Sequence, residues 1–334
     1  MNMLTLIIII LGVSFILYAL LGGADFGAGI VEIFAGKKGE KTVSKAIAPV
    51  WEANHVWLIL AIVILFMGFP QVYAAISTSL HIPLMITLIG IVLRGSSFTF
   101  RHYDEGHDSF HKYYTLVFKI SSFITPFFLG ITLGAMMFGR VDLNMNGSFY
   151  GVFINPWLNA FCIMMGIFST VLFGYIASVF MTGEAAYPVE QKRYRRLAKV
   201  FLLAAIAAGV WVFAIAEWQG HHLFNKFFHS PFSMAALSLV VLLVPLVFHL
   251  LDHPVTAYLR MAVSAQVALI MLGWFAIQFP VLVYEKNGHH LTFYNTQAPQ
   301  ATLKQLLIAL FAGLALVVPS FYFLFRVFKK PKEQ

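Results

Sequence analysis

Apolar residues occupy most of the chain in nine long segments, which short polar stretches separate. The segments lie at about 4–23, 51–69, 72–96, 115–138, 157–181, 197–217, 232–251, 258–282 and 303–326. An α-helix rises about 1.5 Å per residue, so about 20 residues cross the roughly 30 Å of bilayer hydrocarbon. The pattern therefore predicts an all-α polytopic membrane protein with about nine transmembrane helices.

The second and third segments form one apolar stretch that a helix break must divide. No Asp, Glu, Lys or Arg occurs from Ala53 to Leu93. A single helix of that length would be about 60 Å long, twice the hydrocarbon thickness. The residues Gly68-Phe69-Pro70-Gln71 are the strong helix breaker near its middle. We expect the chain to turn back there.

The loops between the segments are short, which predicts a single transmembrane domain over residues 1–334. Two weakly similar halves, about 1–140 and 150–282, each begin with a hairpin that a long basic loop closes. This similarity favours two four-helix bundles. The ninth helix, about 303–326, then lies outside them as a peripheral helix.

The composition excludes an ordinary soluble domain. Hydrophobic residues make up 60% of the chain and charged residues 11%, whereas typical soluble proteins contain about 25% charged residues. The net charge of +8 raises the question of nucleic acid, but a basic excess in a membrane protein first indicates cytoplasmic loops. We therefore expect no nucleic-acid partner.

The basic residues lie mainly on one side of the predicted helices. Of the 22 Lys and Arg residues, four lie on the other side, namely Arg140, Lys226, Lys286 and Lys304. Cytoplasmic loops are the ones enriched in Lys and Arg. The asymmetry predicts an N-terminus outside the cell and a C-terminus in the cytoplasm.

Ionisable residues within or beside the spans suggest a proton path. Asp25 follows the first segment among four glycines, which indicates either an acid buried by close packing or a carboxylate facing water at a helix end. Glu52 and His55 share a helix face between Trp51 and Trp57. Buried carboxylates and imidazoles can relay protons near neutral pH. The alternative for Glu52 and His55 is a solvated helix start.

Two histidine patterns raise the question of a metal or haem. His81 lies inside the third segment, where it could ligate haem iron or relay protons, although a lone His on an apolar face is more often a hydrogen-bonded packing residue. His107 and His111, in the polar loop at 101–111, could share a helical face as metal ligands or stand in solvent.

Three motifs go beyond composition. They are Gly-Gly-Ala-Asp-Phe-Gly-Ala-Gly at 22–29, Ala-Pro-Val-Trp-Glu-Ala-Asn-His-Val-Trp-Leu at 48–58, and Leu-Arg-Gly-Ser-Ser-Phe-Thr-Phe-Arg at 93–101. In this order and spacing they resemble subunit II of the cytochrome bd quinol oxidases, including the cyanide-insensitive branch. The residues that match the family motifs are Asp25, Trp51, Asn54, Trp57, Arg94 and Arg101. Glu52 departs from the pattern, because the family usually has Asp there, and His55 stands where some members have Gln.

The resemblance implies a heterodimer with subunit I, which carries haems b and d and the quinol site and reduces dioxygen to water. It implies that this chain binds no haem alone, supports assembly, and contributes Asp25, Glu52 and His55 to proton uptake from the cytoplasm. It leaves room for a bound quinone, for membrane lipid in a groove, and for a small accessory subunit. The expected location is a bacterial or archaeal cytoplasmic membrane.

A second interpretation from another class stays open at this point. Nine spans in two similar halves, with glycine-interrupted helices, also suit a proton-coupled secondary transporter. A transporter would purify alone and without colour, whereas an oxidase subunit would bring a haem-bearing partner with it.

Overall fold

The computed structural model describes residues 2–49, 51–103, 110–145, 147–253 and 256–328. In chain order, these residues form α1 (Met3–Leu17), the π-helix η1 (Tyr18–Gly22), α2 (Gly23–Ile47), α3 (Trp51–Asn54), α4 (Val56–Gly68), α5 (Pro70–Ser79), α6 (His81–Tyr103), α7 (His111–Phe138), α8 (Phe149–Phe153), α9 (Ala160–Glu184), α10 (Pro188–Trp218), α11 (Leu223–His229), α12 (Pro231–Asp252), α13 (Thr256–Gln278), β1 (Val281–Val283), β2 (Leu291–Thr292) and α14 (Gln300–Phe328).

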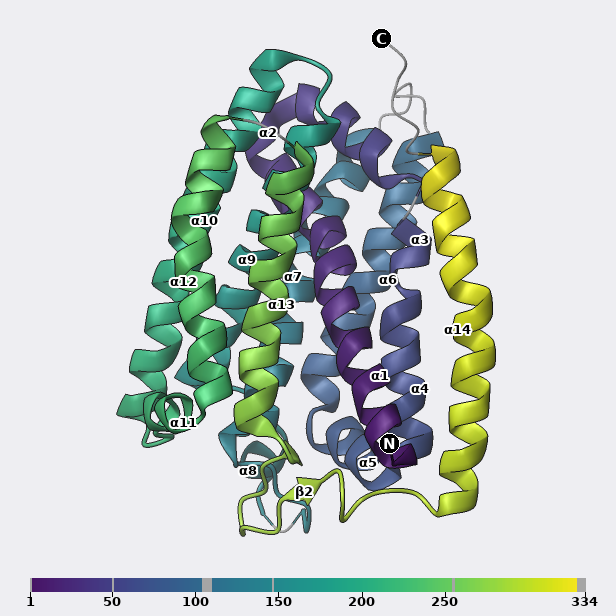
Figure 1. Cartoon of the computed structure of the whole chain (residues 1–334), viewed down its shortest axis with the longest axis vertical. Helices are drawn as coiled ribbons and strands as arrows, with labels where there is room; N and C mark the ends of the chain where they lie inside the picture. Colours follow the sequence, from purple (N-terminus) through teal and green to yellow (C-terminus); the bar gives the residue numbers. More distant parts are fainter. Residues whose placement is uncertain (1, 50, 104–109, 146, 254–255, 329–334) are drawn as a thin grey trace.

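Nine helical segments among the described residues are long and apolar enough to cross a membrane. They are Met3–Gly36, Trp51–Gly68, His81–Arg101, His111–Phe138, Ala160–Glu184, Pro188–Trp218, Pro231–Asp252, Thr256–Gln278 and Gln300–Leu324. The prediction of an all-α polytopic membrane protein with about nine transmembrane helices is therefore confirmed. The helices run side by side between two ends of the molecule (Figure 1).

The first span is longer than the sequence pattern predicts, and its expected end at residue 23 is wrong. Helices α1 and α2 continue into each other through η1, and the span reaches Gly36. There a positive φ of 67° kinks the chain, a backbone conformation that glycine adopts without steric cost. A charged residue such as Asp25 usually marks the end of a span, but here Asp25 is buried within the first span.

The third span also differs from the prediction, because it begins at His81 rather than at residue 72. The expected break at 68–71 is present, with Phe69 in a non-helical conformation before Pro70. A second break at Leu80, with φ −111° and ψ 23°, separates α5 from α6. Helix α5 therefore lies at the end of the molecule, near the start of α1 (Figure 1).

The eighth span ends at Gln278 rather than near residue 282. Residues Val281–Val283 instead form β1, which pairs antiparallel with β2. Pro280 precedes this strand, and proline lacks the N–H group that a continuing helix would need. The hairpin lies at the same end as α5, α8 and α11 (Figure 1).

Helix α9 occupies the centre of the molecule and α14 its edge. Helix α9 packs against α10, α7 and α2, and 61% of its most apolar 18-residue stretch is buried inside the molecule. In α14 only 11% of the corresponding 18-residue stretch is buried, and its main packing partners are α4 and α1. The ninth helix is therefore peripheral (Figure 1). The two similar halves stay a prediction.

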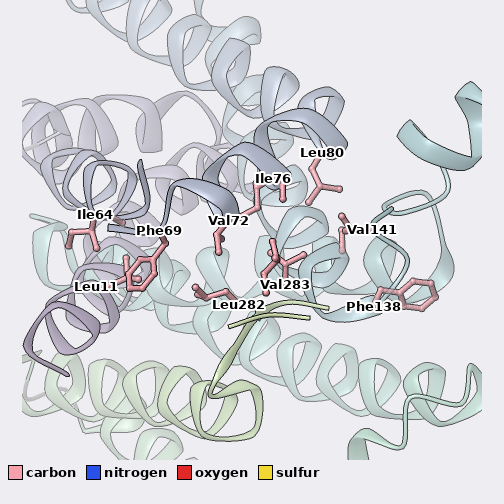
Figure 2. Close-up of a cluster of buried hydrophobic side chains, with 14 of the residues drawn as sticks. Leu11, Ile64, Phe69, Val72, Ile76, Leu80, Phe138, Val141, Leu282 and Val283 are labelled. Carbon is pink, nitrogen blue, oxygen red and sulfur yellow. The ribbon is translucent and has the colours of Figure 1, made fainter. Parts of the chain in front are cut away.

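An apolar cluster closes the end of the molecule that carries the hairpin. Figure 2 shows Leu11 of α1, Ile64 of α4 and Phe69 in one group, with Leu282 and Val283 of β1 further along the same cluster. These side chains belong to one buried hydrophobic core. The cluster ties α1 to α4 at this end. At the opposite ends of these two helices lie η1, which follows α1, and α3, which precedes α4.

Candidate functional site

Two ion pairs lie buried between α2 and α6. In the first, Arg94 Nη2 is 2.7 Å from Asp25 Oδ1 and also donates a hydrogen bond to the Asp25 carbonyl oxygen at 3.0 Å. In the second, Arg101 Nη1 lies 2.8 Å and 3.0 Å from the two carboxylate oxygens of Glu32. The four side chains are at most 2% exposed. A charge in hydrocarbon is costly unless paired, so each pair satisfies a charge that could not remain alone.

The spacing of the four residues explains how two helices make both pairs. Asp25 and Glu32 are seven residues apart on α2, and Arg94 and Arg101 are seven residues apart on α6. Seven residues make about two helical turns, which returns each side chain to the same face. Because α2 and α6 run in the same direction, equal spacing brings both pairs into register.

Phe118 of α7 lies between the two arginines. Its ring centroid is 5.4 Å from Arg94 Cζ and 4.3 Å from Arg101 Cζ, and the ring is fully buried. Aromatic faces attract guanidinium groups, more strongly when water is excluded. Around the second pair, Lys119 Nζ lies 3.6 Å from Glu32 Oε1, and Arg101 Nη2 donates to Ser44 Oγ at 3.2 Å.

The second family motif meets the first ion pair at the break between α3 and α4. Asn54 is buried and donates from Nδ2 to the Leu21 carbonyl oxygen of η1 at 3.4 Å. His55 interrupts the helix, and its ring lies against Tyr18 and Phe26, with centroid distances of 6.2 Å and 5.8 Å. The hydrogen-bond pattern of a π-helix differs from that of an α-helix. Here the Asn54 side chain binds one carbonyl oxygen of η1, that of Leu21.

The remaining motif residues surround this contact. Trp57 is buried and packs against Phe321 of α14 at a centroid distance of 5.6 Å. Trp51 packs against Phe98 at 5.8 Å and lies over Gly95, where an added Cβ would be 3.1 Å from the indole ring. Glu52, in contrast, is exposed on the surface of the chain. The expectation of a desolvated carboxylate at position 52 is not met within this chain.

The structure thus brings Asp25, Asn54, His55 and Arg94 together and leaves Glu52 at the rim. Sequence reasoning missed Glu32, because the first span was expected to end before it. The signal was present nonetheless, since Asp25 and Glu32 repeat the spacing of Arg94 and Arg101.

A shallow groove runs beside the motif residues on the outer face of α6. It has a volume of about 420 Å³ and is lined by Trp51, Ile91, Val92, Gly95, Ser96, Thr99 and Phe100. The lining combines apolar side chains with two hydroxyl groups and a glycine. Small and hydroxylated residues are typical of helix contacts within membranes.

The position of His81 differs from the expectation of a residue inside the third span. His81 is the first residue of α6. Its Nδ1 lies 2.8 Å from the Thr78 carbonyl oxygen, and its ring packs edge-on against Phe153 at a centroid distance of 5.1 Å. These contacts fit a hydrogen-bonded packing residue at the start of the span.

The histidine loop at 101–111 falls partly outside the described residues. His107 lies outside them, and His111 Nε2 is 2.8 Å from Glu40 Oε1. Among the described residues, no three His, Cys, Asp or Glu side chains gather as a set of metal ligands.

The fold and this site define a class, a polytopic helical membrane protein with charged groups paired at membrane depth. The sequence matches the family described as cytochrome bd terminal oxidase subunit II over residues 3–328. The chain therefore belongs to this family.

Individual relatives agree with this assignment. The chain is 26% identical to cytochrome bd ubiquinol oxidase subunit 2 of Bacillus subtilis over 327 residues, which cover 96% of this chain and 94% of that protein. It is 27% identical to cytochrome bd-I ubiquinol oxidase subunit 2 of Escherichia coli over 213 residues, or 61% of this chain and 55% of that protein. Its fold resembles a chain of the bd oxidase from Geobacillus thermodenitrificans, with a TM-score of 0.80, 22% identity, and coverage of 98% and 99% of the two chains.

Proposed function

We propose that this chain is subunit II of a membrane-bound quinol:oxygen oxidoreductase, a terminal oxidase in which a partner subunit I carries haems b and d. The family match over residues 3–328 is the observation that carries this proposal. It also favours the oxidase over the alternative of a secondary transporter. In this proposal the chain supports assembly of subunit I and helps to deliver protons for the reduction of dioxygen to water.

The surface around Trp51 supports association with a partner subunit. The groove beside Trp51 presents Ser96 and Thr99 among apolar side chains, and Glu52 is exposed at the start of the adjacent span. Hydroxyl groups and a carboxylate are poor neighbours for lipid tails. A protein partner on this face would satisfy them.

Proton delivery is supported by the order of the polar residues. Reducing one dioxygen to two waters consumes four protons, and bare ions cannot cross low-dielectric protein without groups that bind them. Glu52 is exposed at the rim, His55 lies one helical turn further on, and Asp25 is buried behind it. We assign these three residues to the route.

Association can be tested by purification under mild detergent. We expect a tagged copy of this chain to bring a larger subunit and a haem absorption spectrum with it. A colourless chain that purifies alone would contradict the proposal and favour the transporter.

Proton delivery can be tested with Glu52→Gln, which keeps the shape of the side chain but cannot titrate. Positioned proton-transfer groups contribute roughly 10²- to 10⁴-fold, so we expect quinol-driven oxygen consumption per haem to fall at least about tenfold. Glu52→Asp should retain most activity, because the family usually has Asp there. Asp252→Asn removes an exposed carboxylate outside the proposed route and serves as the control. A normal rate in Glu52→Gln would leave Glu52 as a helix-start residue only.

A further inference from the structure

Five buried polar atoms gather around η1 without a hydrogen-bond partner among the described residues. They are Tyr18 Oη, Asp25 Oδ2, Asn54 Oδ1, His55 Nδ1 and Arg94 Nε. The side chains that carry them come from three separate parts of the chain. Tyr18 is 5% exposed, Asp25 3%, Asn54 4% and Arg94 1%. His55 is partly exposed, but its Nδ1 is buried.

The five atoms belong to one place in the fold. The Tyr18 and His55 rings are neighbours at 6.2 Å, and the Phe26 ring links His55, at 5.8 Å, to Arg94 Cζ, at 4.7 Å. Asn54 is held against η1 by its bond to the Leu21 carbonyl oxygen. An added Cβ on Gly22 would lie 3.0 Å from the Tyr18 ring. Glycine at position 22 therefore lets that ring lie close to the π-helix.

The energetics require partners for these atoms. Leaving a buried donor or acceptor unsatisfied costs about 1–3 kcal/mol, and nearly all buried polar groups in native proteins have a partner. The set is also chemically complementary. Tyr18 and Arg94 donate, Asn54 and Asp25 accept, and His55 Nδ1 can do either. A buried water typically makes two to four hydrogen bonds to groups of this kind.

We propose that a small cluster of buried water molecules occupies the space between Tyr18, Asn54, His55 and the Asp25–Arg94 pair. The unpartnered atoms supply the hydrogen bonds that hold the water. The water then connects His55 to the free oxygen of Asp25, whose other oxygen stays paired with Arg94.

The functional part of this inference rests on the proposed proton delivery, whereas the presence of water does not. A proton released by His55 Nδ1 passes to a water molecule, and that water gives one of its own protons to Asp25 Oδ2. His55 loses one proton, Asp25 gains one, and the water is restored. Tyr18 takes no part in the transfer and acts as a positioning residue, because its hydroxyl group orients the water.

Hydroxyl-radical footprinting of the intact purified complex in detergent tests for the water directly. Radiolysis of a bound water modifies the side chain beside it even where bulk water is excluded. We expect Tyr18 to be modified at least about fivefold more than Tyr175, because an ordered water contacts only the former. Tyr175 is the matched control, since it is 2% exposed and its hydroxyl group donates to Gln266 Oε1 at 2.7 Å. Tyr187, at 67% exposure, sets the upper limit. Equal, low modification of Tyr18 and Tyr175 would overturn the water cluster.

The variant Tyr18→Phe tests the positioning role, because it keeps the ring over Gly22 and removes only the hydroxyl group. We expect proton uptake in liposomes, normalised to haem, to fall at least about threefold, with Tyr175→Phe as the control of equal chemistry. The same footprint, read in that variant on the side chains around position 18, should weaken. Unchanged proton uptake with a strong Tyr18 footprint in the wild type would overturn the positioning role. A strong footprint combined with normal rates in Glu52→Gln would instead contradict the proposed function while leaving the water in place.

Discussion

At the scale of single residues, the sequence identifies charged groups but does not identify their partners. Asp25, Arg94 and Arg101 stand out because charge is costly within a span. That Arg94 binds Asp25 and Arg101 binds Glu32 depends on how α2 and α6 lie together. For Glu52 the sequence motif identifies the residue but not its environment. Its exposure depends on how the helices pack, which a linear pattern does not encode.

The buried pair makes Arg94 a residue whose loss destabilises the protein. Arg94→Gln leaves the Asp25 carboxylate buried without its counter-charge, which typically costs roughly 3–5 kcal/mol. We expect a lower Tm of the purified complex in detergent. The double variant Asp25→Asn with Arg94→Gln should recover part of the loss, because no bare charge remains.

The control for this prediction is the pair of Lys199 and Asp252, whose side chains are 33% and 59% exposed. Lys199→Gln should change the Tm little, since exposed pairs contribute little to stability. Equal effects of Arg94→Gln and Lys199→Gln would show that the buried charge is not costly.

A second residue-scale prediction concerns pH and lies outside the spans. The His221 ring packs between Phe138 and Phe161, at centroid distances of 4.3 Å and 5.8 Å. Burial lowers the pKa of His221, and the positive charges of Lys226 and Arg140 lower it further. The unfolded chain, with a His pKa near 6.5, therefore binds more protons than the folded chain as pH falls. The stabilisation is fully present above about pH 6.5 and is lost as the pH falls below it.

Thermal unfolding between pH 8 and pH 5 measures this effect. The Tm of the wild type should fall more steeply below about pH 6.5 than the Tm of His221→Gln, which cannot titrate. His229→Gln is the control, because His229 is exposed and does not contribute to the shift at His221. Parallel pH profiles for wild type and His221→Gln would assign the pH dependence to other groups.

At the scale of elements, hydropathy predicts which segments cross the membrane better than where they end. The first span continues past its charged residue because α6 provides Arg94 as a partner for Asp25. The third span starts late because Leu80 breaks the helix although it is apolar. Both errors come from contacts or backbone angles that the hydropathy of a residue does not report.

The packing of α2 also depends on Gly27. The sequence does not show which of the four glycines at 22–29 makes the closest helix contact. A Cβ added to Gly27 would overlap the Phe173 carbonyl oxygen of α9 and lie 2.8 Å from Ala177 Cβ. Small residues permit this kind of close approach between helices in membranes. Gly27→Ala must therefore separate α2 from α9 or shift one of them.

We expect Gly27→Ala to lower the Tm and the yield of assembled complex. Gly313 of α14 is the matched control, because no atom lies within 4 Å of an added Cβ there. Gly313→Ala should be neutral or stabilising, since alanine favours helix by about 1 kcal/mol over glycine. A wild-type Tm for Gly27→Ala would mean that the α2–α9 contact is less tight than the structure indicates.

At the scale of the whole molecule, the number of spans follows from the sequence. The reason is that apolar length alone decides whether a helix can cross a bilayer. The face that meets a partner could not be predicted in the same way. Lipid and a protein partner both favour apolar side chains, and the hydroxyl groups of Ser96 and Thr99 in the groove at Trp51 become visible as a surface feature only in the structure.

The orientation of the whole molecule is the last prediction, and it fixes the side from which protons are taken up. Lys192 lies near the start of α10 and Lys226 lies beyond its end, and both side chains are exposed. Helix α10 has 31 residues and therefore spans about 45 Å. The two lysines thus lie on opposite sides of the membrane, with Lys192 in a basic cytoplasmic segment according to the charge asymmetry.

The chain offers a clean way to test this, because its single cysteine, Cys162, is buried. A membrane-impermeant maleimide should label Lys226→Cys in intact cells and should label Lys192→Cys only after the membrane is opened. The unmodified chain gives the background from Cys162. The reverse pattern would place the N-terminus in the cytoplasm. Glu52 lies at the opposite end of α4 from the hairpin, so that result would also move its proposed proton entry to the outer side of the membrane.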